Sequence, residues 1–221
     1  MTDQRVGAAG GIVFVILSLA AGAILPKPPA ADASASELGR YFGQHHDRIQ
    51  TSGALAALAA VALLALVVSL AERLSEDRLA SRLALAGGTV LVSLSILGAL
   101  VQALVAQISS RISGDTLVLA FAVDEAAFYV APAIAVIALM VAVARGASAA
   151  GLPTWIAAFA LLIAAVGIVA GVGQLVTTSS AMSAFGFAGF VLTVVWVAAV
   201  SVVLLRLERT VRTVSPVGAA A

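Results

Sequence analysis

The chain has 221 residues and a formal net charge of +1; 62% of its residues are hydrophobic and 10% are charged. A soluble fold of this length leaves about 30% of its chain surface in water, and here that surface would be largely apolar, so the composition excludes an ordinary soluble domain. The charges are scattered over short loops, which excludes a basic surface for nucleic acid, and the lack of cysteine excludes disulfides and thiolate metal sites.

Six long apolar runs dominate the sequence. Each reaches the roughly 20 residues that a helix needs to cross a hydrocarbon core about 30 Å thick. Their approximate bounds are 6–25, 50–71, 83–108, 116–144, 153–176 and 183–205. They predict an all-α, polytopic membrane bundle of six transmembrane helices, which forms a single domain over residues 1–221 and has the lipid bilayer as its main partner.

The first run has two interpretations. Arg5 precedes it and small residues such as Ala21 and Ala23 follow its apolar part, as in a secretory signal peptide. The run is longer than the usual apolar core of a signal peptide. We therefore favour an uncleaved helix, with a cleaved signal peptide as the alternative.

The distribution of arginine predicts the orientation of the bundle. Six spans place most of the basic residues on one side of the membrane, namely Arg5, Arg73, Arg78, Arg82, Arg145, Arg206, Arg209 and Arg212. The basic residues on the other side are partly offset by acidic neighbours. Because lysine and arginine are retained on the cytoplasmic side, we expect both termini in the cytoplasm and the protein in a bacterial inner (plasma) membrane.

The longest connection, residues 26–49, lies on the extracytoplasmic side in this topology. Three prolines begin it as a stiff, extended segment. Ser34 and Glu37 then have the spacing of a capping box, in which each side chain binds a free backbone N–H at the start of a helix. We expect a helix that runs from here into the second span; a simple exposed loop is the alternative.

Most of the unusual polar side chains fall at one depth. Counting 1.5 Å per residue from the cytoplasmic arginines puts Asp124 and Glu125 at the outer boundary of the fourth span, and one glutamine of the third span and one of the fifth at the same boundary. The predicted outer rim, which we expect to bind a ligand, consists of His45, His46, Gln102, Arg111, Asp124, Glu125 and Gln174.

Two kinds of chemistry fit this rim. Asp124 and Glu125 either share a proton or bind a cation, or they form structural ion pairs with Arg111 or Arg48. The adjacent histidines point about 100° apart on a helix, so they cannot chelate one ion together, although one of them could join the carboxylates. No catalytic or phosphate-binding motif occurs, and we expect no enzyme, no resident cofactor and no metal site.

Two runs have features that bear on packing. The fourth has roughly 29 residues, which as a helix would extend about 43 Å, and Pro132 predicts a kink within it, so the continuity of this helix stays open. In the fifth run, Gly167 and Gly171 leave one face without side chains. This spacing predicts the close approach of another helix, within the bundle or in a homo-oligomer.

The layout resembles the uncharacterised six-helix, multi-pass inner-membrane proteins common in high-GC actinobacteria. The features that carry the resemblance are the Arg40-Tyr41-Phe42 approach to the second span, the Gly151-Leu152-Pro153-Thr154-Trp155 entry to the fifth, and Ala- and Arg-rich text with one lysine. The resemblance covers most of the chain. It implies residence in the inner membrane and implies no activity.

The leading hypothesis is a non-enzymatic membrane protein whose outward-facing polar mouth binds a small ligand, a lipid or a partner subunit. One alternative is a proton- or cation-coupled small-molecule transporter that uses Asp124 or Glu125. A transporter needs polar groups near the bilayer midplane, where this sequence has few. The other alternative is a haem- or metal-binding redox protein that uses His45 or His46.

Overall fold

The computed structural model describes residues 3–30, 33–112, 114–176 and 180–214. Within these ranges the chain is helical apart from short connections and contains no strand, which confirms the all-α class. Five helices are long and apolar enough to cross a membrane, as expected of a multi-pass membrane protein. Helices suit lipid because they satisfy their backbone hydrogen bonds internally.

The helices follow the predicted runs closely. They are α1 (Asp3–Ile24), α2 (Ala35–Arg73), α3 (Arg78–Ile108), α4 (Asp115–Glu125), the π-helix η1 (Ala126–Val130), α5 (Ala131–Gly146), α6 (Thr154–Val176) and α7 (Ser180–Val214). Five of the six runs each fall on one helix, except that Leu25 and Pro153 lie one residue outside α1 and α6. The fourth run is shared by α4, η1 and α5.

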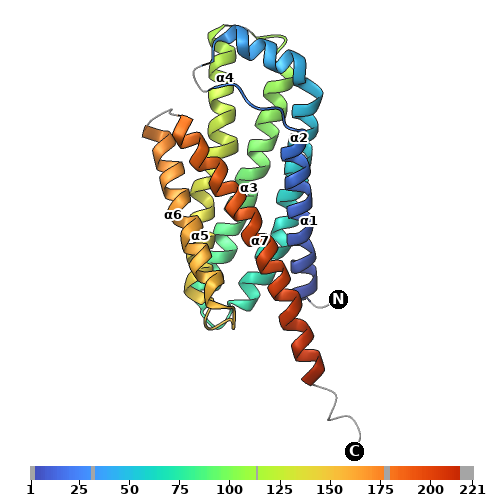
Figure 1. The fold of residues 1–221 in the computed structure, drawn as a ribbon, viewed down its shortest axis with the longest axis vertical. Helices are drawn as coiled ribbons and strands as arrows, with labels where there is room; N and C mark the ends of the chain where they lie inside the picture. Colours follow the sequence, from blue (N-terminus) through green and yellow to red (C-terminus); the bar gives the residue numbers. More distant parts are fainter. Residues whose placement is uncertain (1–2, 31–32, 113, 177–179, 215–221) are drawn as a thin grey trace, which may run out of the picture.

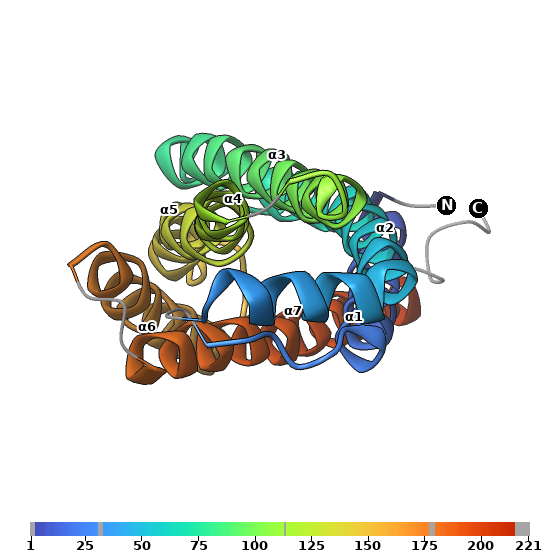
Figure 2. The ribbon, with the colours of Figure 1, turned by 90° about the horizontal axis from the view of Figure 1, so that it is seen from above.

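The helices pack side by side in a closed order of neighbours (Figures 1 and 2). α1 contacts α2, α2 contacts α3, α3 contacts α5, α5 contacts α6, α6 contacts α7, and α7 returns to α1. The start of α1 and the end of α7 lie at the same end of this ring of helices (Figure 1).

The fourth run is helical throughout but changes its winding. α4 ends at Glu125, the π-helical turn follows, and Pro132 lies in the first turn of α5. Proline offers no N–H and crowds the carbonyl four residues earlier, so a regular α-helix cannot pass through it undisturbed. A π-helical turn is wider and absorbs the disturbance. The question of continuity is thereby answered, because the helix is rewound at the predicted kink and does not break.

α2 is much longer than a membrane span because it begins at Ala35. Glu37 N–H donates to Ser34 Oγ at 3.4 Å, and Ser34 N–H donates to Glu37 Oε2 at 2.8 Å. The capping box is confirmed, and the alternative of an exposed loop is wrong for residues 35–49. Figures 1 and 2 show this first part of α2, the cap helix (residues 35–49), lying across one end of the bundle, which we call the cap end.

The bend between the cap helix and the rest of α2 has a local cause. Thr51 Oγ1 donates to Asp47 O at 2.8 Å, a bond that competes with the helical ladder, and a Ser-Gly pair follows at Ser52 and Gly53. Both features bend helices. Gly53 also allows α2 to approach α3, because a Cβ there would lie 3.0 Å from Ala99 O.

Two apolar clusters hold the bundle together. The larger runs along the ring of helices and includes Trp196, whose indole N–H donates to Ile156 O at 3.2 Å. The smaller joins the cap helix to α3 and α4, and its buried members are Leu38, Phe42, Ile49, Val105, Ala106, Leu117 and Phe121. Burial of these side chains fixes the cap helix on the end of the bundle.

Gly167 and Gly171 face α5, and the predicted close approach of helices is confirmed there. A Cβ on Gly167 would lie 2.9 Å from Ala133 O, and one on Gly171 would lie 2.7 Å from Ile134 Cγ1. Both distances are too short for a real contact. The two glycines therefore serve packing within the chain, and a homo-oligomer stays a prediction.

At the end opposite the cap helix, the α2–α3 turn is fastened to α5. Asp77 accepts hydrogen bonds from Leu79 N–H and Ala80 N–H, each at 3.1 Å, and so caps α3. Arg145 Nε lies 2.9 Å from Asp77 Oδ2. The pKa of Asp77 lies below its ordinary value mainly because its carboxylate accepts the bond from Ala80 N–H. The Arg145 guanidinium lowers this pKa further.

We expect Asp77→Ala to lower the unfolding temperature at neutral pH, because the cap and the ion pair are lost together. The folded-state pKa of Asp77 lies below the ordinary value of 3.8. The stability that the ionised Asp77 carboxylate contributes is therefore fully present above this ordinary value. It is lost as the pH falls through the folded-state pKa. Thermal unfolding in detergent should show the difference between the two proteins shrinking below about pH 4.

Glu76→Ala is the matched control, because Glu76 is an exposed carboxylate on the same turn. It should leave the unfolding temperature nearly unchanged at every pH. A difference between Asp77→Ala and the unaltered protein that stays constant down to the lowest pH would contradict the role of the Asp77 charge.

Candidate functional site

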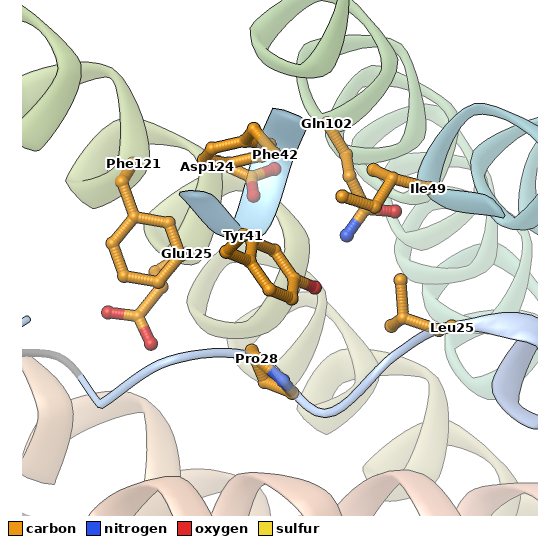
Figure 3. A pocket seen from close by; sticks show the side chains of 9 residues that line it. All are labelled: Leu25, Pro28, Tyr41, Phe42, Ile49, Gln102, Phe121, Asp124 and Glu125. Atoms are coloured by element: carbon orange, nitrogen blue, oxygen red, sulfur yellow. The ribbon is translucent and has the colours of Figure 1, made fainter. Parts of the chain in front are cut away.

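A small cavity lies at the cap end, between the cap helix, α3, α4 and the segment that joins α1 to α2 (Figure 3). It offers about 10 Å³ to the centre of a water molecule, which is room for about one water. Its lining residues are Leu25, Pro28, Tyr41, Phe42, Ile49, Gln102, Phe121, Asp124 and Glu125. Three residues of the predicted rim, Gln102, Asp124 and Glu125, therefore meet at one place.

The helices bring these side chains together from distant parts of the sequence. Gln102 lies near the end of α3, and Asp124 lies in the last turn of α4, directly before the π-helical turn. The cap helix covers both. Its Phe42 ring meets the Phe121 ring of α4 edge to face, with the ring centroids 6.3 Å apart. This aromatic contact helps to hold the cap helix over the cavity.

Two of the residues that line the cavity each bury an oxygen atom that has no hydrogen-bond partner in the described part of the chain, namely Gln102 Oε1 and Asp124 Oδ1. Gln102 is 5% exposed and Asp124 is 6% exposed. A buried acceptor without a donor costs about 1–3 kcal/mol, and more when it is charged, so native proteins keep few of them. Both atoms accept hydrogen bonds or bind cations. Only a hydrogen-bond donor or a positive charge can satisfy them.

The predicted ion pairs are not found in the part of the chain that the structure describes. Glu125 is half-buried, and its carboxylate points away from Gln102 (Figure 3). Arg48 Nε donates to Ile24 O at 3.1 Å, and Arg111 is exposed in the α3–α4 connection. Neither arginine pairs with a cavity carboxylate, so the negative charge of an ionised Asp124 has no protein partner there.

The segment between α1 and α2 is fastened to α2 and covers the cavity. Tyr41 Oη donates to Pro26 O at 3.2 Å, and Ser52 Oγ donates to Ala21 O at 3.0 Å. The bond from Tyr41 holds the extended segment against the cap helix, and the bonds from Ser52 and Arg48 hold the last turn of α1 against α2. Figure 3 shows Pro28 and Leu25 on this segment, beside the Tyr41 ring.

The two histidines are close to the cavity but do not line it. The His45 ring meets the Tyr41 ring edge to face, with centroids 5.5 Å apart, and so supports Tyr41 from outside. His46 Nδ1 lies 3.1 Å from Asp47 Oδ1 on the exposed side of the cap helix. Among the described residues, no group of three or more His, Asp or Glu side chains is placed to hold a metal ion.

The remaining rim residues are dispersed. Gln174 lies in the last turns of α6, and its side chain is outside the described part of the structure. Sequence reasoning used Tyr41 and Phe42 only as part of the approach to the second span and did not include them or Phe121 in the site. The signal that could have found Phe42 is its spacing from Leu38 and Ile49, which together mark the buried face of the cap helix.

No family model matches the sequence, and neither the curated proteins nor the solved structures contain a match to it.

We expect Asp124→Asn to raise the free energy of unfolding by about 1–3 kcal/mol in the absence of added ligand. The substitution keeps the shape of the side chain and removes a buried carboxylate that no described protein group neutralises. Asp115→Asn, at the exposed start of α4, is the matched control and should change stability by less than about 0.5 kcal/mol.

Unfolding in detergent, followed by the fluorescence of the two tryptophans, measures both variants. A gain in stability on removing a buried polar group is the usual mark of a residue kept for function. A clear loss of stability in Asp124→Asn, with no loss in Asp115→Asn, would show that Asp124 has a stabilising partner and would contradict this assignment.

Proposed function

We propose that this chain is a bacterial inner-membrane protein that crosses the bilayer six times, with both termini in the cytoplasm. The closed ring of helices supports this topology, with α4, η1 and α5 together forming the fourth crossing. The arginines at the end opposite the cap helix support the orientation, because basic residues are retained on the cytoplasmic side. The cap helix then lies outside the cell.

The extracytoplasmic end is a non-enzymatic binding module for a small ligand that carries a positive charge or hydrogen-bond donors. The observation that carries this proposal is the pair of buried acceptors, Gln102 Oε1 and Asp124 Oδ1, which belong to two residues lining one cavity and have no partner among the described residues. Acceptors without a donor select a ligand by the groups that the ligand must bring.

The size of the cavity further limits which ligands can bind there. Room for about one water excludes haem and drug-sized molecules from this space as it stands, since their sites measure about 300–1,000 Å³. A small ligand therefore fits the site better than a lipid or the side chains of a partner subunit do.

A proton- or cation-coupled transporter is the second candidate, and the π-helical turn favours it. Interrupted helices beside ion sites are a common feature of transporters. Here η1 follows Asp124 and Glu125 directly. Cation uptake by proteoliposomes that Asp124→Asn abolishes would assign transport, whereas binding without uptake would assign the module alone.

The topology can be tested cleanly because the chain contains no cysteine. Ser36 is exposed on the cap helix and Ser75 is exposed on the α2–α3 turn. We expect a membrane-impermeant maleimide to label Ser36→Cys in intact cells, and to label Ser75→Cys only after the membrane is permeabilised. The two variants are each other's controls. The reverse pattern would overturn the orientation, and labelling of both in intact cells would show that α2 does not cross the membrane between them.

Binding can be tested by thermal unfolding of the purified protein with a panel of small cations, namely lithium, sodium, potassium, ammonium and methylammonium chlorides. Choline chloride, whose cation is too large for the cavity, sets the baseline at equal ionic strength. We expect at least one member to raise the unfolding temperature of the unaltered protein and not of Asp124→Asn. If no member gives a rise that depends on Asp124, the binding module is wrong.

A further inference from the structure

The cavity at the cap end is enclosed between two walls that belong to different parts of the chain. The outer wall lies on the segment after α1 and on the cap helix, and consists of Leu25, Pro28, Tyr41, Phe42 and Ile49 (Figure 3). The inner wall lies on α3 and α4, and consists of Gln102, Phe121, Asp124 and Glu125. We call residues 25–30 and 33–49 the flap, because they cover the inner wall as one layer.

The polar contacts described above hold the flap at its base and hold its two parts together. The bonds from Ser52 and Arg48 hold the last turn of α1 against α2, where the flap begins and ends. The bond from Tyr41 to Pro26 O joins the extended segment to the cap helix. These three bonds lie at the base of the flap or inside it. They are therefore kept when the flap moves as one body.

Both ends of the flap are places where the chain can change direction. On α2, the bond from Thr51 Oγ1 to Asp47 O competes with the helical ladder, and Gly53 follows two residues later. On the other side α1 has ended at Ile24, so no helical hydrogen bonds oppose a change in direction there. Hinges of moving segments are a few residues of this kind at the ends of elements.

Away from its base, the flap packs on α3 and α4 through apolar side chains. Leu38 and Phe42 of the flap are buried in one cluster with Val105 of α3 and with Leu117 and Phe121 of α4. Burial of apolar surface stabilises this closed position of the flap. Such contacts are not directional, so they can be broken and formed again without a fixed set of hydrogen bonds.

The closed position also has a cost, because the flap covers two polar groups. Gln102 Oε1 and Asp124 Oδ1 are buried without a partner in the described chain. In an open position, water would donate to both oxygen atoms and stabilise the carboxylate. Opening therefore loses apolar burial and regains the hydration of two polar side chains. Because the two contributions oppose each other, opening costs less free energy than unfolding the bundle.

We propose that the flap is a hinged lid, which opens and closes over Gln102 and Asp124 while the ring of helices stays folded. This inference goes beyond the proposed binding function and does not depend on it, because the movement needs no ligand. In the open position the inner wall faces water. The lid thus gives solutes a route to side chains that its closed position buries.

The test uses a single cysteine as a reporter of opening, because the chain contains none. Ala106→Cys places a thiol beneath the flap, at a position on α3 that is 1% exposed and belongs to the cluster under the cap helix. Ala84→Cys is the matched control, because Ala84 is also a buried alanine on α3 but belongs to the larger cluster, away from the flap. Purified protein in detergent and choline chloride is treated with N-ethylmaleimide at about pH 8. The thiol at position 106 should react faster than the thiol at position 84, and equal rates would overturn the lid.

Two substitutions in the Ala106→Cys protein should change this rate in opposite directions. Phe42→Ala removes a buried ring that holds the flap on α4 and should accelerate the reaction at least tenfold. Asp124→Asn keeps the shape of the side chain and removes the charge that water stabilises in the open position, so it should slow the reaction about tenfold. Asp115→Asn, at the exposed start of α4, should leave the rate unchanged.

The double substitution of Phe42→Ala with Asp124→Asn separates movement from a hole in the packing. A hole left by the missing ring would expose the thiol at the same rate whether residue 124 is charged or not, whereas a moving flap would again be slowed about tenfold. No slowing by Asp124→Asn in either protein would overturn the lid. Equal acceleration of Ala84→Cys by Phe42→Ala would mean that the whole bundle loosens, and would overturn it too. These rates are measured without the small cations, so failure of the cation panel rejects the binding module and not the lid.

Discussion

Lipid offers no hydrogen-bond partner to a polar group, and this constraint orders the whole molecule. It makes the apolar runs helical, and it makes the hydroxyl groups inside those helices turn back to backbone carbonyls, as Ser201 Oγ does to Val197 O at 2.8 Å and Thr193 Oγ1 does to Gly189 O at 2.8 Å. By that standard Gln102 and Asp124 are exceptions, because each buries an oxygen that no described group satisfies. The rule that shapes the rest of the bundle is therefore not met by two residues that line the cap-end cavity.

The irregular features of the fold lead to the same place. The π-helical turn separates α5, which contacts α3 and α6 in the ring, from α4, which contacts α3 and the long α2. The rewound helix is thus directed toward the cap helix instead of continuing along α6. Asp124 and Glu125 lie at the point of this change, and Pro132 is its local cause. The bend of α2 has the complementary effect, since it lays the cap helix over the end of α4 and closes the cavity that the two helices share.

Features that depend on distance along a helix could be predicted from the sequence, and features that depend on rotation about the helix axis could not. The helices, the capping box of Ser34 and Glu37, and the common depth of Gln102 and Asp124 follow from hydropathy, spacing and the rise of 1.5 Å per residue. The inward direction of Tyr41, the absence of an ion pair to Asp124 and the π-helical turn required knowledge of which face meets which neighbour. Helices that are apolar all round carry no periodicity from which that face can be read.

The structure beneath the cavity favours a binding site over a passage. Gln102 and Asp124 are the only buried carboxamide and carboxylate among the described residues, and the other buried polar side chains are serines. Below them the large apolar cluster fills the ring, and fully buried residues such as Trp196 and Met140 close it. An ion that enters from the cap end therefore meets no charged group that would carry it further. The cavity lies where the cap helix, α3 and α4 meet, so a ligand bound there would touch all three and would favour the packed position of the cap helix.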